Sequence, residues 1–90
     1  MAYDPFVDPD SRIDYKIDWS DELNGDVIVS SEWFSDRSDI TIDTVEYDGT
    51  QSVVWIKDVI DGETYELTNR IHTAEGRVED QTITVIGRQK

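Results

Sequence analysis

The chain has 90 residues, enough for one domain, and it carries 21 Asp and Glu against 8 Lys and Arg, which gives a formal net charge of −13 at pH 7. This charge argues against a nucleic-acid partner, because phosphates would be repelled and the basic residues form no patch. The absence of cysteine excludes a disulfide framework and a thiolate metal site, and no apolar run approaches the ~18 residues of a membrane span.

Residues 1–11 are expected to form an extended N-terminal arm that contributes little to folding. Asp4-Pro5 and Asp8-Pro9 hold the backbone extended or turned and remove hydrogen-bond donors. Phe6 and Val7 lie between them, apolar but outside any periodic segment. They either cover one edge of the domain or reach a neighbouring subunit, and they are the candidate partner-contact residues.

Apolar and polar residues alternate through the next segments, the period of half-buried strands. Residues 13–19 predict a first strand, and residues 26–34 predict a second with Val27, Val29 and Trp33 facing inward. A third strand is expected over residues 40–47. Residues 53–56 are apolar on both faces, which predicts a central or corner-placed strand.

Two further strands are expected over residues 65–73 and 78–86, joined by a turn at 74–77. Tyr65, Leu67 and Ile71 share the inward face of the first of them, together with two polar residues, Asn69 and Thr73. Buried polar groups need partners, so both are expected near the ends of the fold. The large rings of Trp19, Trp33 and Trp55 are expected to fill the core.

Turns recur every dozen residues or so, and no segment favours a helix with any force. Six or seven short strands with this spacing predict an all-β fold, an immunoglobulin-like antiparallel β-sandwich. The expected organisation is the arm at 1–11, the sandwich at 12–87 and a short basic tail at 88–90.

The block from Gly62 to Gly76 combines a Gly-x-x-Tyr step, an alternating strand and a small-residue turn. It resembles the last two strands of fibronectin type III and related immunoglobulin-like domains. In those families a tyrosine at the strand start bonds back to the preceding corner, and Tyr65 is the candidate for that role.

A wider resemblance runs from Asp8-Pro9-Asp10 through Ile86. Its parts are Ile-Asp-Tyr-x-Ile-Asp-Trp, Gly-Asp-x-Ile-x-x-Ser-x-Trp, Val-x-Trp-Ile and Gly-x-x-Tyr-x-Leu-Thr-Asn-Arg-Ile-x-Thr-x-x-Gly-Arg. This pattern resembles a group of small structural proteins of the head and tail of tailed bacteriophages and prophages. The resemblance implies a virion location after assembly in the host cytoplasm.

Catalysis has little support in the sequence, and no enzyme activity and no cofactor are expected. The only histidine, His72, is expected on the outward face of its strand, and nothing singles out a nucleophile. Five acids could supply calcium ligands if the arm folded near Asn24-Gly25: Asp8, Asp10, Asp21, Glu22 and Asp26. No calcium-loop spacing is present, so solvated carboxylates are the preferred interpretation and no metal site is assigned.

The sequence therefore predicts a non-enzymatic virion protein that binds capsid or tail subunits, as a head decoration or cement protein or a head–tail adaptor. Self-association into an oligomer is left open, and neither nucleic acid nor membrane is expected as a partner. The alternative is a host-surface adhesion module that binds carbohydrate or a receptor through its loops. Exposed aromatics grouped at one loop end would favour adhesion, whereas an apolar edge with an ordered arm would favour subunit binding.

Overall fold

The computed structural model describes residues 4–89. Met1, Ala2 and Tyr3 of the expected arm and Lys90 of the expected tail lie outside the described residues. The part of the chain that the structure describes forms seven strands and a one-turn helix: β1 (Phe6–Val7), β2 (Ile13–Asp18), α1 (Ser20–Leu23), β3 (Ile28–Ser35), β4 (Thr41–Tyr47), β5 (Gln51–Lys57), β6 (Thr64–Thr73) and β7 (Val78–Gly87).

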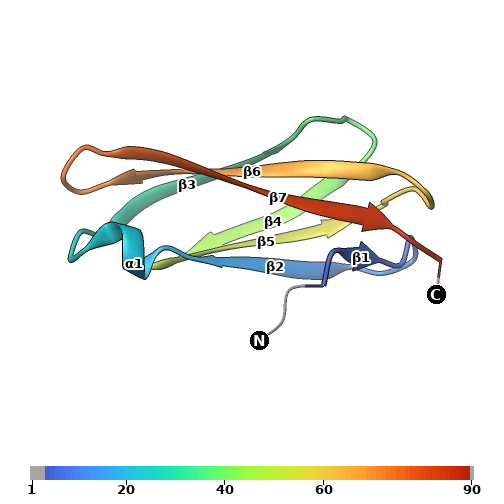
Figure 1. The fold of residues 1–90 in the computed structure, drawn as a ribbon, viewed down its shortest axis with the longest axis horizontal. Helices are drawn as coiled ribbons and strands as arrows, with labels where there is room; N and C mark the ends of the chain where they lie inside the picture. The colour runs from blue at the N-terminus through green and yellow to red at the C-terminus, as the bar shows by residue number, and fades with distance from the viewer. Residues whose placement is uncertain (1–3, 90) are drawn as a thin grey trace.

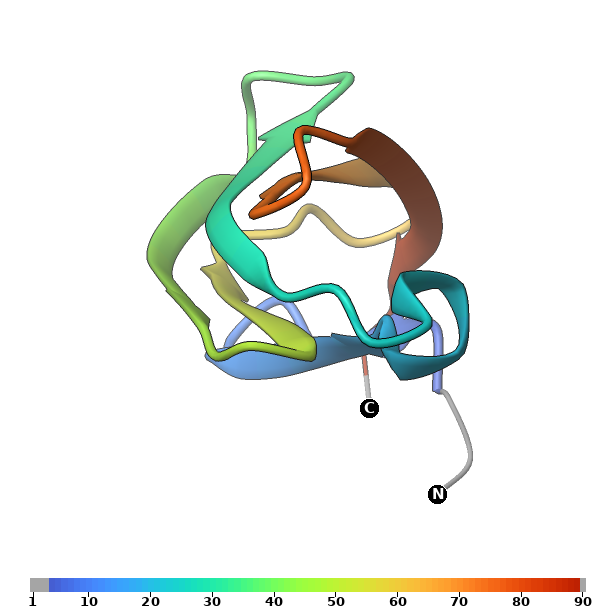
Figure 2. The ribbon, with the colours of Figure 1, turned by 90° about the vertical axis from the view of Figure 1, so that its left-hand side faces the viewer.

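The strands form two sheets, one in the order β1-β7-β6-β3 and the other in the order β2-β5-β4. Figure 1 shows the elongated fold, and the end-on view in Figure 2 shows the strands surrounding a common interior, with β7 and β2 on adjoining sides. The predicted all-β sandwich is confirmed, with β5 in the centre of its sheet. All pairings between long strands are antiparallel, as expected, whereas β1 runs parallel to β7.

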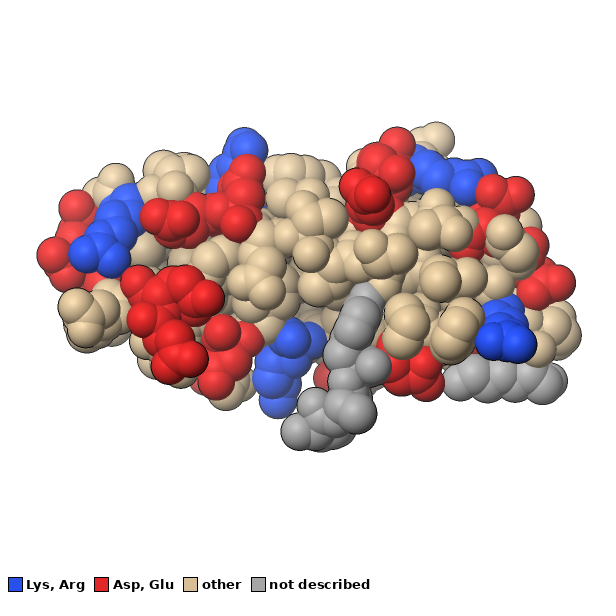
Figure 3. Space-filling view, in the orientation of Figure 1, with Lys and Arg blue, Asp and Glu red and all other residues tan. Residues whose placement is uncertain are grey.

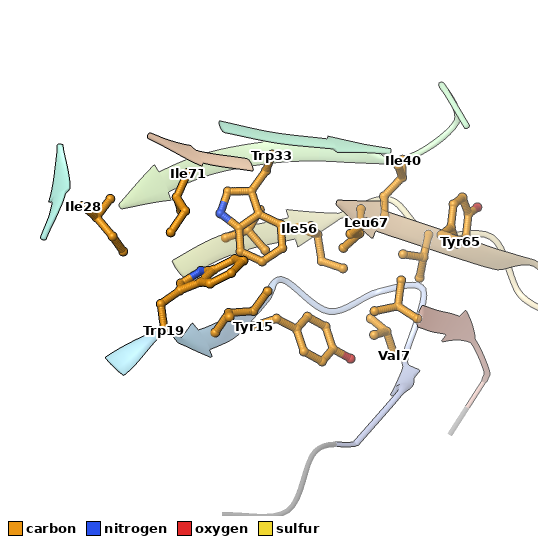
Figure 4. Close-up of a cluster of buried hydrophobic side chains, with 14 of the residues drawn as sticks. Val7, Tyr15, Trp19, Ile28, Trp33, Ile40, Ile56, Tyr65, Leu67 and Ile71 are labelled. Atoms are coloured by element: carbon orange, nitrogen blue, oxygen red, sulfur yellow. The ribbon is translucent and has the colours of Figure 1, made fainter. Parts of the chain in front are cut away.

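The core lies between the sheets and is built from one face of every strand (Figure 4). Strand β6 alternates strictly, and Tyr65, Leu67 and Ile71 are fully buried. Trp19, Trp33 and Ile56 pack into the same cluster. In β2 and β6 the apolar residues recur at every second position, so these strands bury a continuous stripe and turn their charged residues to water.

The inward face of the second strand differs from the prediction at its beginning. Ile28 is buried, whereas Val27 and Val29 are 44% and 51% exposed. Ile28 pairs with Thr73 but Ser30 already pairs with His72, so Val29 is an extra residue in a β-bulge. The extra residue reverses the alternation, which explains why Trp33 faces inward as predicted although Val27 and Val29 do not.

The expected arm is partly a strand of the sandwich. The amide of Ile86 donates to Pro5 O (2.7 Å) and the amide of Arg88 donates to Val7 O (2.8 Å). Val7 is 1% exposed and belongs to the core. The side chain of Val7 is therefore used inside the domain and is not available to a partner, which corrects the expectation of partner contact at this position.

The beginning of the expected tail is held as well. Arg88 lies over the ring of the half-buried Phe6, 4.7 Å from its centroid, and the amide of Gln89 donates to Asp61 Oδ1 (2.8 Å). These contacts join the two ends of the described chain. No helix among residues 4–89 is long and apolar enough to cross a membrane.

Candidate protein-interaction surface

The corner before β6 is closed by Tyr65. Its hydroxyl accepts a hydrogen bond from the amide of Ile60 at 3.0 Å, within the upstream corner where the sequence placed it. Arg37 lies 4.9 Å from the Tyr65 ring centroid and bonds both Glu63 and Asp39. Those hydrogen bonds raise the pKa of Arg37, so the cation is permanent and holds the loop before β4 against this corner.

The three tryptophans divide between the interior and the surface. Trp19 and Trp33 are buried at 2% and 7% exposure. Trp55 lies instead on the outer face of β5, half-buried beneath Arg12, whose guanidinium carbon is 4.3 Å from the ring centroid. The expectation that Trp55 fills the core is therefore wrong, because β5 turns Val54 and Ile56 inward and the ring between them must point outward.

Asn69 lies in the interior between the sheets and not near an end of the fold as expected. Its Oδ1 accepts from Trp19 Nε1 (2.9 Å), and its amide nitrogen donates to Ser31 Oγ (2.8 Å) and Glu32 O (2.9 Å). Ser31 in turn donates to Ser52 Oγ of the other sheet (3.1 Å). The buried amide is thus fully used, and it fixes the two sheets relative to each other.

Asp26 is the buried carboxylate of the fold. Its Oδ1 accepts from the amides of Val27 (2.8 Å) and Glu75 (3.2 Å), and Arg77 Nε lies 3.9 Å from Oδ2. Burial would raise the pKa of Asp26, but hydrogen bonds from Thr73, Val27 and Glu75 and the charge of Arg77 outweigh it and lower the pKa. Asp26 therefore ties the start of β3 to the β6–β7 turn as a carboxylate.

The five acids considered as calcium ligands do not come together. Asp26 is committed to its own contacts, and Asp8 accepts the amide of Asp10 at 2.9 Å in a local turn. Within residues 4–89, no group of three or more His, Cys, Asp or Glu side chains has the arrangement of a metal site. His72 is partly exposed and lies 3.5 Å from Glu32, across the outer face of its sheet.

Four exposed apolar residues gather where β3 and β4 meet, an area that we call the edge patch: Val27, Val29, Val45 and Tyr47. Their exposed fractions are 44%, 51%, 39% and 47%. The Tyr47 hydroxyl donates to Val29 O (2.8 Å), and the amide of Ile28 donates to Gly49 O (3.0 Å), so the two edge strands are held together here. The sequence did not reveal this patch, because the bulge at Val29 leaves no mark in the alternation.

A shallow hollow adjoins the edge patch on the outer face of β2, β5 and β4. It has a volume of about 270 Å³ and shares Tyr47 with the patch; its other lining residues are Lys16, Glu46, Asp48, Gln51 and Val53. Mixed polar and apolar walls that open to solvent suit a protein contact better than an enclosed small-molecule site.

Comparison with known families bears directly on these surfaces. Residues 8–86 match the Gp77 family, described as podophage GP4 fiber-tail adaptor protein gp77. The chain belongs to the Gp77 family. It is therefore a structural component of a bacteriophage virion. No curated protein matches the chain.

The Gp77 match covers the strands that build the edge patch and the hollow, from β2 to within β7. It begins at Asp8, directly after β1, so Phe6 and Val7 lie outside it. The matched residues therefore include β2 to β6 and most of β7.

Proposed function

We propose that this protein is an adaptor that joins a fibre to the tail of a podophage virion by passive protein–protein contact. The family match over residues 8–86 carries the proposal, because the family's description names a fiber-tail adaptor. Among the locations considered from the sequence, this description favours the tail over a head decoration. A family of structural adaptors favours a connector over an enzyme.

The exposed surfaces support contact with subunits over adhesion. An apolar edge is present at Val27, Val29, Val45 and Tyr47, and Phe6–Val7 is ordered as β1. Among residues 4–89 the exposed aromatic residues are not grouped, because Phe34 lies near one end of β3 and the Tyr47 hydroxyl bonds Val29 O at the other end. We infer that the edge patch is one contact surface, since exposed apolar clusters mark interaction sites.

We also infer that the sandwich is of immunoglobulin type. Sheet order β2-β5-β4 facing β7-β6-β3 reproduces the strand order of constant-type domains, with the first strand moved beside the last. The Tyr65 hydroxyl on Ile60 supports the same assignment, because a tyrosine at this corner is typical of such domains.

The adaptor role is tested in phage particles assembled without this protein. Such particles should carry tails that lack fibres, and adding the purified protein should restore fibre attachment. Val29→Lys should restore attachment at least ~10-fold less well, because a buried unpaired charge at an interface costs several kcal/mol. Ile60→Lys is the matched control, since Ile60 is similarly exposed (46%) and lies away from the patch. Full fibre attachment without the protein would overturn the proposal.

A further inference from the structure

Most of the long strand β7 has an unpaired edge. Its inner edge pairs with β6 from Thr64↔Ile86 to His72↔Val78, while β1 pairs only with Ile86 and Gly87. Among residues 4–89, Val78 to Val85 therefore have no strand on their outer side. Figure 1 shows the long β7 with the short β1 near its C-terminal end.

The backbone of this edge is oriented for pairing. The amides of Ile86 and Arg88 point outward, because they donate to Pro5 and Val7 of β1. Backbone groups alternate along a strand with a period of two residues. The amides and carbonyls of Val78, Asp80, Thr82 and Thr84 therefore point outward as well, and they form a row of donors and acceptors.

The other sheet edges carry features that discourage strand addition. Strands β3 and β4 each contain a register shift, and β1 lies between Pro5 and Pro9. Strand β2 exposes Asp14, Lys16 and Asp18 in alternation. Bulges, prolines and charges are the usual protection of edges.

Strand β7 lacks this protection in its middle. It pairs with β6 without a register shift, and Val78 to Val85 contain neither proline, glycine nor lysine. Residues 81–85, Gln-Thr-Ile-Thr-Val, are uncharged and mostly β-branched. In Figure 3 the middle of this face is largely uncharged, and acidic side chains gather toward its ends.

Charge identifies what this edge accepts. Four acids near the start of β7 have no ion-pair partner among the described residues: Asp21 and Glu22 of α1, Glu75 and Glu79. The helix α1 lies beside the β6–β7 hairpin, because Arg77 Nη1 is 3.4 Å from Glu22 O. A second copy of the chain, also at −13, would bring like charge to these acids. A segment with Lys or Arg at this end would gain attraction instead.

We propose that the β7 edge from Val78 to Val85 takes up an extended segment of a neighbouring virion protein as an added strand, with basic residues of that segment beside Glu79 and α1. The strand would extend the sheet through main-chain hydrogen bonds, and its side chains would provide specificity. This inference rests on the adaptor role proposed above, for which it names the second contact surface.

Hydrogen exchange read by mass spectrometry tests the added strand. Full-length protein free in solution is compared with the same protein loaded onto phage particles that were assembled without it. In the peptide covering residues 78–85, the amides of Asp80, Thr82 and Thr84 should exchange at least ~10-fold more slowly on the particle than in the free protein. Equal exchange in both states would overturn the inference, as would protection already present in the free protein, which would show that its own chain or a second copy covers the edge.

A pair of variants isolates the backbone contribution. Thr82→Pro removes an outward amide but leaves the inward amides that bond β6, so it should weaken particle binding at least ~10-fold with the fold retained by circular dichroism. Thr82→Ala is the matched control, since it loses the hydroxyl contact with Thr68 (2.9 Å) and keeps the amide. If Thr82→Pro unfolds, Thr82→Lys is compared with Thr68→Lys, its cross-strand partner on β6, because a lysine on an edge strand discourages strand addition whereas one on the inner strand does not. Binding that is equal within either pair contradicts the added strand, whereas fibres that attach without the protein contradict the adaptor role itself.

Discussion

Tyr65 contributes a hydrogen bond to the corner before β6, and the bond is partly buried. The hydroxyl satisfies the amide of Ile60, and the ring is fully buried. We expect Tyr65→Phe to lower the free energy of unfolding by about 1 kcal/mol, or roughly 4–8 °C in Tm, because the amide loses its partner. Tyr47→Phe removes a hydroxyl that bonds Val29 O at an exposed site, where water replaces it, and should change Tm much less. Equal effects in thermal melts would contradict the special role of Tyr65.

Gly87 matters because another part of the backbone passes against it. A Cβ atom on Gly87 would lie 2.0 Å from Ile60 O, and its amide and carbonyl already bond Glu63 and Gly62. Gly87→Ala should therefore destabilise the domain by about 2 to 3 kcal/mol, since two backbone segments must separate. Gly49→Ala is the control, because its Cβ would meet only the Val27 side chain, at 3.7 Å from Cγ1 and 3.9 Å from Cβ. This substitution should change stability by less than about 0.5 kcal/mol. Denaturant unfolding of both variants gives the comparison, and a tolerated Gly87→Ala would show that the corner yields easily.

At the scale of the elements, β1 shows how a short strand is recruited to the core. Val7 is buried and its carbonyl bonds Arg88, so β1 closes the interior between β7 and β2. Val7→Ala should cost about 2 kcal/mol, the value of burying a valine side chain. Phe6→Ala should cost less, because Phe6 is only half-buried beneath Arg88.

Thermal melts of the two variants test this ranking, together with removal of residues 1–9. The removal should lower Tm at least as much as Val7→Ala, contrary to the expectation of an arm that contributes little to folding. An unchanged Tm after the removal would show that β1 adds nothing to the stability of the sandwich.

Alternation was enough to predict β2 and β6, because each of them buries one continuous stripe. The inward face of β6 followed from it directly. The central place of β5 was one of the two positions expected for a run that is apolar on both faces. Alternation failed at Val29, where a bulge inserts one residue, and at Trp55, where a strand apolar on both faces gives no parity. It also missed the pairing of Phe6 and Val7, because two residues are too few to show a period. The edge patch depends on the bulge, so the candidate surface was beyond the sequence for the same reason.

For the whole molecule, acid stability follows from carboxylates that the fold uses as anions. Hydrogen bonds from Arg70 lower the pKa of Asp80, and backbone amides of Thr50 and Gln51 lower that of Asp48. The pKa of Asp26 is also lowered. A depressed pKa in the folded state gives stability above the unfolded pKa of about 3.9, and this stability is lost as pH falls below it.

Tm measured in ~0.5 M NaCl should therefore hold from pH 7 to about 5 and fall below about 4. Asp80→Asn should make that fall shallower, because one of the contributing carboxylates is removed. A Tm that stays constant down to about pH 2.5 would show that these contacts do not favour the folded state.

The excess of acid also opposes folding at neutral pH. The 21 Asp and Glu exceed the 8 Lys and Arg by 13 charges, and these are confined to a body with extents of 42 × 27 × 17 Å. At ~0.01 M salt the screening length is about 30 Å, so charges repel one another across most of the molecule, whereas at ~0.15 M it is about 8 Å, below its smallest extent. Unfolding separates the charges, so the repulsion destabilises the folded state most at low salt.

We therefore expect Tm at pH 7 to rise by several degrees between ~0.01 M and ~0.5 M NaCl, although salt weakens the surface ion pairs of Arg12, Arg37 and Arg70. The control is the same titration near pH 4.1, the sequence pI, where the net charge vanishes and the rise should disappear. If Tm rises equally at both pH values, salt acts through general exclusion from the surface and not through screening. A fall in Tm at pH 7 would mean that the ion pairs contribute more to stability than the repulsion removes. The acidic surface would then not destabilise the free protein, and a basic partner segment would have no repulsion to relieve.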